Sequence, residues 1–194
     1  MKKITYAVII ITLITLFGTQ AMANAIDKTV NKFRRIQHTT PFFKHAYGYA
    51  VFPTVGAGGF IIGASYGKGS VFVNGKQTGT STLTAASIGF QLGGKAFSEI
   101  IFFKDKAAYD TFTQGSFAFG AKASATVLTV GAAAEVGSSG ASTSAGTGAL
   151  GHNKTATGAG SYVNGMATFV LAKGGLMYKA AIGGQKFSFT ALKQ

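Results

Sequence analysis

The fold is decided around residues 71–76, which read Val71-Phe72-Val73-Asn74-Gly75-Lys76. Asn-Gly readily supplies the two positive φ angles of a type I′ turn, so the residues before it are predicted to pair with the segment after Lys76 in a hairpin. A second Asn-Gly pair, Asn164-Gly165, predicts that residues 161–163 pair in the same way with residues 166–171. The chain is therefore expected to be rich in antiparallel β-structure.

Further strands are predicted from alternating apolar residues and from β-branched or aromatic runs bounded by glycine. They cover residues 59–65, 85–92, 99–103, 117–133, 176–182 and 185–189, and residues 173–189 as a whole indicate a meander. The predicted fold class is α+β, with a mainly antiparallel sheet of sandwich or barrel-like form, short N-terminal helices and one inner helix.

Two short helices are predicted from their capping residues. Thr40-Pro41 indicates a helix with Thr40 as the N-cap, followed by an end at Gly48. Asp105 is predicted to cap the inner helix, in which Ala108, Tyr109 and Phe112 share a face and which is closed by a glycine at position 115.

The N-terminus has the pattern of a cleaved secretory signal peptide. Two lysines precede an uncharged run from Ile4 to Phe17, and residues 21–23, Ala-Met-Ala, supply a small-x-small cleavage site. A membrane anchor would need about 20 apolar residues, whereas residues 18–20 interrupt this run. We expect removal of residues 1–23 and a periplasmic location, peripheral on the inner or the outer membrane. The chain has no cysteine, so acylation of a lipoprotein type is excluded.

Residues 26–38 carry an amphipathic and basic pattern. In a helix that advances about 100° per residue, the apolar residues share one narrow arc (Ile26, Val30 and Phe33) and cations lie on the far side (Lys28, Lys32 and Arg35). Such a helix can lie in a membrane interface with its apolar face down. The same pattern describes a surface helix packed on the protein's own core, and the sequence leaves both interpretations open.

The composition argues against catalysis and for an anionic partner. The chain has 18 Lys+Arg, 5 Asp+Glu, 3 His and no Cys, so paired acids, metal clusters and thiol nucleophiles are scarcely available. Removal of residues 1–23 leaves 16 basic against 5 acidic residues, a formal charge of +11. Charge alone also fits nucleic acid, but an exported protein meets anionic phospholipid or lipid A phosphates instead. We expect no enzymatic activity, no metal, no cofactor and no nucleic acid.

Two patterns imitate catalytic motifs. Residues 89–95, Gly-Phe-Gln-Leu-Gly-Gly-Lys, have the spacing of a P-loop, but Ala96 follows where the hydroxyl that holds Mg²⁺ is required. Serines are plentiful, as a serine hydrolase would need, but no acid accompanies His152 in its segment. That segment, residues 137–160, is a low-complexity run of Gly, Ser, Ala and Thr and is predicted to be a flexible loop.

The order and spacing of several short motifs resemble one known family. They are Ala46-Tyr-Gly-Tyr-Ala-Val-Phe-Pro53, Gly59-Phe60, Gly63, Tyr66-Gly67-Lys68-Gly69, Ser87-Ile-Gly-Phe-Gln-Leu-Gly93, Ala107, Phe112, Phe119-Gly120-Ala121 and Lys173-Gly174-Gly175-Leu176. Together they resemble the SYLF domain family, a lipid-binding module of bacterial envelope proteins and eukaryotic endocytic proteins. The resemblance implies a basic N-terminal segment at residues 24–48 and a β-rich domain at residues 49–194. The tryptophan that many members carry after the first hairpin is absent.

The resemblance also implies a non-enzymatic function in binding acidic lipid. Carried onto this chain, the cations of the N-terminal segment would be Lys28, Lys32, Arg34, Arg35 and Lys44, and those of the adjoining β surface Lys68, Lys95 and Lys173. At roughly 1 kcal/mol per cation near an anionic surface, five cations would favour acidic over neutral lipid on the order of 10³-fold at low salt.

A small outer-membrane β-barrel, as a structural or channel protein, is the alternative function. Alternating strands, an export signal and glycine richness fit it. The amphipathic N-terminal helix and the final residues Ala191-Leu192-Lys193-Gln194, which lack a terminal aromatic residue, favour the lipid-binding domain.

Overall fold

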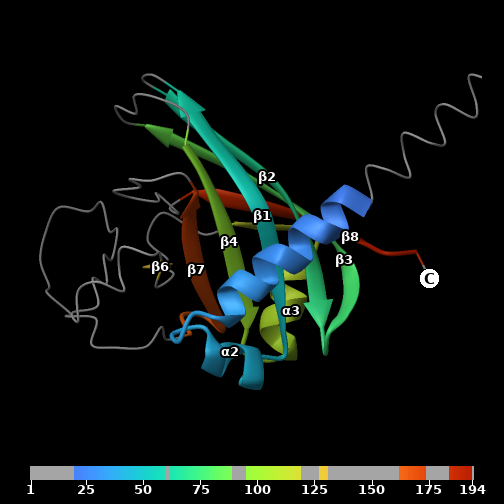
Figure 1. The fold of residues 1–194 in the computed structure, drawn as a ribbon. Coiled ribbons are helices and arrows are strands. Elements are labelled where there is room, and N and C mark those ends of the chain that lie inside the picture. The colour runs from blue at the N-terminus through green and yellow to red at the C-terminus, as the bar shows by residue number, and fades with distance from the viewer. Residues whose placement is uncertain are drawn as a thin grey trace, which may run out of the picture.

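The protein is described here by a computed structural model that places residues 20–59, 62–88, 95–118, 127–130, 162–173 and 184–193. Residues 20–34 are helical and are called the N-terminal helix below. The elements that follow are α2 (Thr40–His45), β1 (Gly48–Gly59), β2 (Ile62–Val73), β3 (Lys76–Ile88), β4 (Lys95–Phe103), α3 (Lys106–Thr113), β5 (Ser116–Ala118), β6 (Val127–Val130), β7 (Met166–Lys173) and β8 (Gln185–Ala191) (Figure 1).

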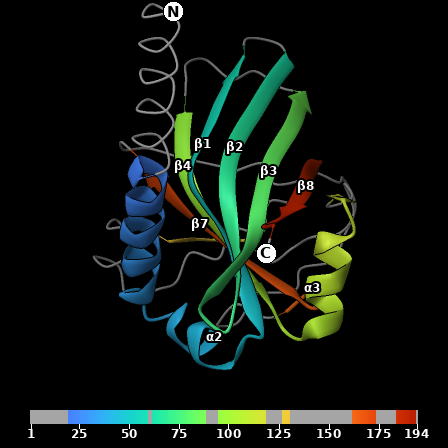
Figure 2. The ribbon, with the colours of Figure 1, turned by 90° about the vertical axis from the view of Figure 1, so that its right-hand side faces the viewer.

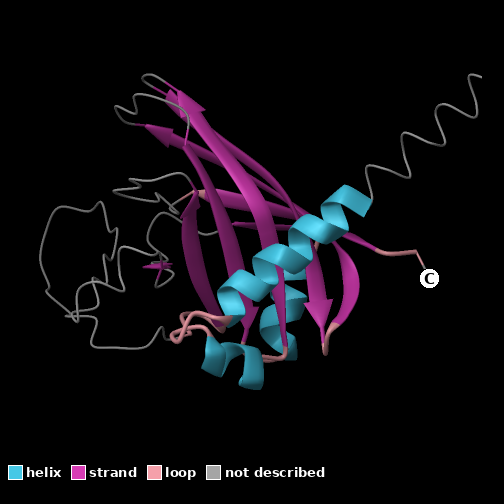
Figure 3. Ribbon diagram, in the orientation of Figure 1, coloured by secondary structure: helices cyan, strands magenta, loops and turns pink. Residues whose placement is uncertain are grey.

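The strands form one eight-stranded sheet in the order β5-β8-β3-β2-β1-β4-β7-β6. Neighbouring strands are antiparallel, except for β6 and β7, which are parallel. Figure 3 shows that strands dominate the fold and that helices are few and short. The predicted fold class, α+β with a mainly antiparallel sheet, is confirmed.

Both Asn-Gly pairs make the predicted turns. Asn74 and Gly75 have φ angles of 50° and 77°, and Val73 pairs with Lys76 where β2 meets β3. Asn164 and Gly165 have φ angles of 52° and 76°, and a bridge joins residues 163 and 166 across that turn. Glycine and asparagine tolerate this left-handed region better than other residues, so local chemistry alone specifies these two hairpins.

The predicted strand at residues 59–65 is wrong, because that stretch spans the end of one strand and the start of the next. Gly59 is the last residue of β1, and β2 starts at Ile62. Gly48, expected to mark the end of a helix, is the first residue of β1. A β-carbon at Gly48 would overlap the carbonyl oxygen of Phe72 on β2, so the glycine permits a close approach of two strands rather than a turn.

The predicted N-cap of α2 is displaced by one residue. Thr39 is the N-cap, Thr40 is already helical, and no side-chain capping bond forms. The Thr39 hydroxyl instead donates to the carbonyl oxygens of Phe33 and Ile36, and so satisfies carbonyls near the end of the N-terminal helix. The α3 cap is confirmed, since Asp105 Oδ1 accepts a hydrogen bond of 2.9 Å from the backbone nitrogen of Ala108.

Other predicted strands have mixed outcomes. Residues 99–103 lie in β4 and residues 185–189 in β8, so both predictions are confirmed. Residues 85–88 belong to the end of β3. Residues 89–94, 119–126, 131–161 and 174–183 lie outside the described part of the chain, and with them the P-loop-like stretch, the 137–160 segment and most of the predicted meander.

Helices cover both faces of the sheet, and each face has its own hydrophobic core (Figure 2). On one face the N-terminal helix and α2 pack with sheet residues, in a cluster that includes Ile26, Val30, Phe33, Phe42, Val51, Ile100, Phe102 and Phe169. On the other face α3 packs Ala108 and Phe112 with Phe52, Ile101 and Phe187. The sheet therefore holds the N-terminal helix in a fixed place.

Candidate functional site

The N-terminal helix uses its apolar face to attach to the sheet. Ile26, Val30 and Phe33 are all buried, and Phe33 is fully excluded from solvent. The interpretation in which this face enters a membrane interface is therefore wrong for the packed helix, because the face is already covered. The alternative interpretation, a surface helix packed on the core, is confirmed.

The cations of the N-terminal segment all lie on the outside of the molecule. Lys28, Lys32, Arg34, Arg35 and Lys44 are exposed. Since the opposite face of the helix is fixed on the sheet, Lys28, Lys32 and Arg35 are held toward solvent. Among the residues that the structure describes, the one ion pair is Lys106 with Asp110 on α3, so none of these cations is neutralised by a carboxylate there.

Arg34 differs from the other cations because it lies against aromatic rings. Its guanidinium carbon is 4.5 Å from the centroid of the Phe43 ring, a cation–π distance. Burial raises the pKa of Tyr49, and the nearby guanidinium of Arg34 opposes part of that shift. Arg34 therefore helps to attach the helix to α2 and β1 and is less available to an external ligand.

Two of the three lysines proposed on the β domain meet at Thr54. Lys173 Nζ on β7 donates a hydrogen bond of 2.6 Å to Thr54 Oγ1 on β1. Lys68 on β2 is the register partner of Thr54, so their β-carbons are cross-strand neighbours. Lys95 pairs through its backbone with residue 57, and its side chain is outside the described part.

Lys32 connects the helix to this group. Burial lowers the pKa of Lys173, and the positive charge of Lys32 lowers it further, so the two cations act on each other electrostatically. We call Lys32, Lys68, Lys173 and Thr54 the lysine cluster. The three lysines can be recognised as basic in the sequence, but only the strand register shows that Thr54 lies beside Lys68.

Among the described carboxylates, Asp27 alone belongs to the N-terminal helix, where it is exposed. The five acidic residues of the chain are Asp27, Glu99, Asp105, Asp110 and Glu135. Asp105 and Asp110 belong to α3 and its cap, on the opposite face of the sheet, and Glu99 is fully buried. Glu135 is outside the described residues. The face that carries the N-terminal helix is consequently dominated by positive charge.

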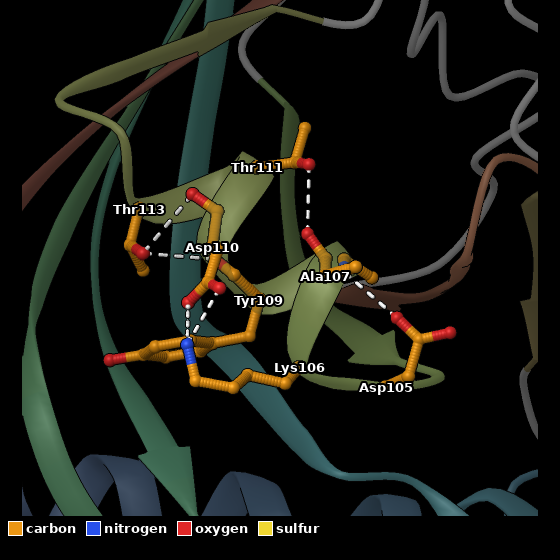
Figure 4. A network of polar contacts seen from close by, with 8 residues as sticks. Asp105, Lys106, Ala107, Tyr109, Asp110, Thr111 and Thr113 are labelled. Atoms are coloured by element: carbon orange, nitrogen blue, oxygen red, sulfur yellow. Dashed lines mark hydrogen bonds and ion pairs between the residues drawn. The ribbon is translucent and has the colours of Figure 1, made fainter.

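The densest polar network belongs to α3 and stabilises that helix. Figure 4 shows Asp105 at the N-cap, the Lys106–Asp110 ion pair at 2.7 Å, and the hydroxyls of Thr111 and Thr113 donating to carbonyl oxygens four residues earlier. Each of these contacts links residues of the same helix or its cap. They are the helix-capping and i,i+4 interactions expected of a short helix, and they leave no converging groups for a ligand.

A buried carboxyl group, which the sequence analysis did not single out, lies inside the sheet. Glu99 on β4 and Gln185 on β8 are both buried, and Gln185 Nε2 donates to Glu99 Oε2 at 2.9 Å. Burial raises the pKa of Glu99 to about 8, although the hydrogen bond opposes the shift. Within the described structure, Glu99 Oε1 and Gln185 Oε1 have no hydrogen-bond partner. A proton on Glu99 supplies the donor that this pair of oxygens lacks.

A signal for this buried acid is present in the sequence. Glu99 stands between Phe97 and Ile101 in a strand, and side chains at i and i+2 share a face. Both neighbours are buried, so alternation places Glu99 inside the same core.

Comparisons with known proteins assign no family. A scan against protein-family models gives no match, and a search of curated proteins finds no significant relative. Among the described residues, no group of three or more His, Cys, Asp or Glu side chains is arranged to hold a metal ion. None of the described helices has the length and hydropathy needed to cross a bilayer.

Proposed function

We propose that this chain is a non-enzymatic, SYLF-like protein that binds acidic lipid at a bacterial envelope membrane. One observation carries the proposal: the N-terminal helix is fastened to the sheet by its apolar face while Lys28, Lys32 and Arg35 remain exposed. A helix held in this way presents its cations without any need to fold on binding. The ligand is an anionic phospholipid or a lipid A phosphate, and the contact is peripheral.

The expected strength of this contact follows from charge alone. Each Lys or Arg near an anionic leaflet contributes about 1 kcal/mol, so three cations contribute about 3 kcal/mol, which corresponds to on the order of 10²-fold in affinity. Because the apolar face is occupied by the core, no hydrophobic insertion adds to this term. Binding should therefore weaken strongly with salt, since surface charges are screened over about 8 to 10 Å at physiological ionic strength.

The proposal includes export to the periplasm with cleavage after Ala23. Residues 20–34 form one continuous helix across that position. The three buried residues that fasten the helix to the sheet, Ile26, Val30 and Phe33, lie beyond the cleavage site, whereas the partly buried Met22, which packs against the same cluster, precedes it. The mature chain would thus keep both the attachment and the exposed cations.

Cosedimentation with liposomes tests the proposal. Changing Lys28, Lys32 and Arg35 together to Gln removes the three outward charges and leaves the buried face intact, so binding to phosphatidylglycerol liposomes should fall on the order of 10²-fold at low salt while Tm stays nearly constant. Lys76, Lys104 and Lys193 are exposed cations outside the helix, and the K76Q/K104Q/K193Q variant controls for total charge.

The two triple variants distinguish a specific role of the helix cations from an effect of net charge alone. The control variant should bind more tightly than the helix variant at every salt concentration, and both should bind phosphatidylcholine as poorly as the wild type does. If both triple variants lose the same affinity, the helix is not the lipid-binding element and net charge alone is responsible. If the wild type ignores acidic liposomes at low salt, the proposed function is wrong.

A further inference from the structure

We propose that the lysine cluster binds the phosphomonoester group of a membrane lipid. This inference rests on the proposed function and names the headgroup chemistry of the same surface. It is carried by the geometry of three strands: Lys173 from β7 is hydrogen-bonded to Thr54 on β1, and Lys68 from β2 is the cross-strand partner of Thr54. The charge of Lys32 on the N-terminal helix acts on Lys173 as well.

All members of the cluster lie on the sheet face that carries the N-terminal helix. Leu171 and Phe72 pack in the core beneath that helix, and alternation along β7 and β2 places Lys173 and Lys68 on the same face. Lys173 does not point along its own strand. It crosses β4 to reach Thr54, where its ammonium is held 2.6 Å from the hydroxyl oxygen.

The floor of the site is made of very small residues. Ala96 on β4 is the register partner of both Gly56 on β1 and Lys173 on β7. Among the described residues, a β-carbon built on Gly56 would meet no atom within 4 Å, so none of their side chains covers this point of the sheet. On the far side of Gly56 stands its β2 partner, Tyr66, whose side chain is 52% exposed. A headgroup can therefore approach the backbone between Lys173 and Tyr66.

The charges of the cluster lack a partner within the described structure. Among the described residues, no ion pair involves Lys32, Lys68 or Lys173, and the positive charges of Lys32 and Lys173 oppose each other. The hydroxyl of Thr54 offers Lys173 an acceptor but no negative charge. An anion that enters the cluster replaces a repulsion with attractions to each ammonium group, which is the electrostatic condition for an anion site.

Charge and donor count favour a phosphomonoester over other anionic headgroups. A phosphomonoester carries about −1.5 to −2 charges at pH 7 and three strong acceptor oxygens, whereas a phosphodiester or a carboxylate carries about one negative charge. Each ammonium group brings up to three donors on a flexible stem, and the Thr54 hydroxyl can donate once Lys173 turns to the phosphate. The cluster therefore matches the more highly charged group.

Vesicles of matched surface charge test this inference with the full chain. Phosphatidylcholine vesicles are doped with phosphatidic acid, phosphatidylglycerol or phosphatidylserine until their zeta potentials agree. Wild-type protein should bind the phosphatidic acid vesicles about fivefold more tightly than the other two, equivalent to about one additional cation–anion contact. The K68Q/K173Q variant should lose that preference and still bind all three kinds, because Lys28, Lys32 and Arg35 remain. Thr54→Val should reduce the preference without changing the net charge.

The controls distinguish this inference from the proposed function. The K76Q/K104Q variant removes two exposed lysines elsewhere and should keep the preference for phosphatidic acid. If wild type binds all three acidic vesicles equally, the headgroup site is wrong but the proposed function still holds. The same conclusion follows if the K68Q/K173Q variant keeps the full preference for phosphatidic acid. If wild type binds none of the acidic vesicles above phosphatidylcholine alone, both proposals are wrong.

Discussion

The carboxyl group of Glu99 on β4 is tied to the side-chain amide of Gln185 on β8, although β1, β2 and β3 lie between these strands in the sheet. The hydrogen bond from Gln185 Nε2 to Glu99 Oε2 is 2.9 Å long, and both residues are buried. Side chains from strands so far apart in the order can meet only if the sheet is strongly curved. The hydrogen bond between Glu99 and Gln185 therefore forms only when the sheet is curved in this way.

We expect the stability of the protein to fall as pH rises from about 5 to about 8. Burial raises the pKa of folded Glu99 to about 8, whereas glutamate in an unfolded chain titrates near 4.3. Between these values the folded state holds a proton that the unfolded state has released. The free energy of unfolding is therefore highest below the unfolded pKa and declines by up to about 1.4 kcal/mol per pH unit as pH rises toward the folded pKa. Urea denaturation across this range measures the slope.

The Glu99→Gln variant is the matched control for that titration. A glutamine at this position still accepts from Gln185 and offers an amide donor in place of the acid proton, so it imitates the protonated acid and cannot ionise. Its stability should be nearly flat over the same pH range. A wild-type slope that persists unchanged in Glu99→Gln would show that another group releases the proton.

Two glycines with the same backbone angle should differ in their tolerance of alanine. Gly75 and Gly165 have φ angles of 77° and 76°, so alanine is strained at both by about 1 kcal/mol. At Gly75 the added methyl meets no atom within 4 Å, whereas at Gly165 it lies 2.9 Å from the β-carbon of Ala108 on α3. Gly165→Ala should therefore destabilise the protein by about 1 to 3 kcal/mol more than Gly75→Ala.

Equilibrium denaturation of both variants checks this difference, and a compensating change confirms its cause. Ala108→Gly removes the methyl that collides, so the double variant G165A/A108G should recover part of the excess loss. Equal destabilisation by the two single changes would mean that the β7 hairpin does not pack on α3 in solution.

Phe33→Ala should destabilise the protein by about 3 to 5 kcal/mol, because a fully buried ring beneath the N-terminal helix is removed. Arg35→Ala, on the exposed side of the same helix, should change stability by no more than about 0.5 kcal/mol. Urea denaturation and liposome cosedimentation on the same samples separate two roles for the ring. If Phe33→Ala leaves stability unchanged but abolishes lipid binding, the ring inserts into the membrane and the packed helix is not the binding form.

How much of the fold could be predicted from the sequence depends on how far apart in the chain the interacting residues lie. The two Asn-Gly turns were predicted because positive φ is a local property of those residues. The start of β1 was missed because the need for glycine at position 48 comes from Phe72, a residue on another strand. The helical pattern of residues 26–38 left two interpretations open, since a helical wheel describes one surface and contains nothing about what covers it.

The candidate site shows the same limit. Exposed lysines are easily recognised as basic in the sequence, and Lys28, Lys32 and Arg35 were assigned to one side of a helix by periodicity alone. Their relation to Lys173 and Thr54 is different, because residues 119 positions apart are brought to hydrogen-bonding distance by the sheet. Only the register of β1, β2, β4 and β7 specifies that arrangement.

The pairing of β8 with β3 also controls how this chain can fold. Strands β1, β2 and β3 follow one another and can form hairpins early, but the Thr84 hydroxyl on β3 donates to the carbonyl of Lys186, 102 residues later. Closing so large a loop is slow. Until residues 185–191 arrive, one edge of β3 lacks its β8 partner, and an unpaired edge is a template for aggregation. Because β3 is synthesised well before β8, the risk of aggregation is concentrated in the interval before β8 docks on β3.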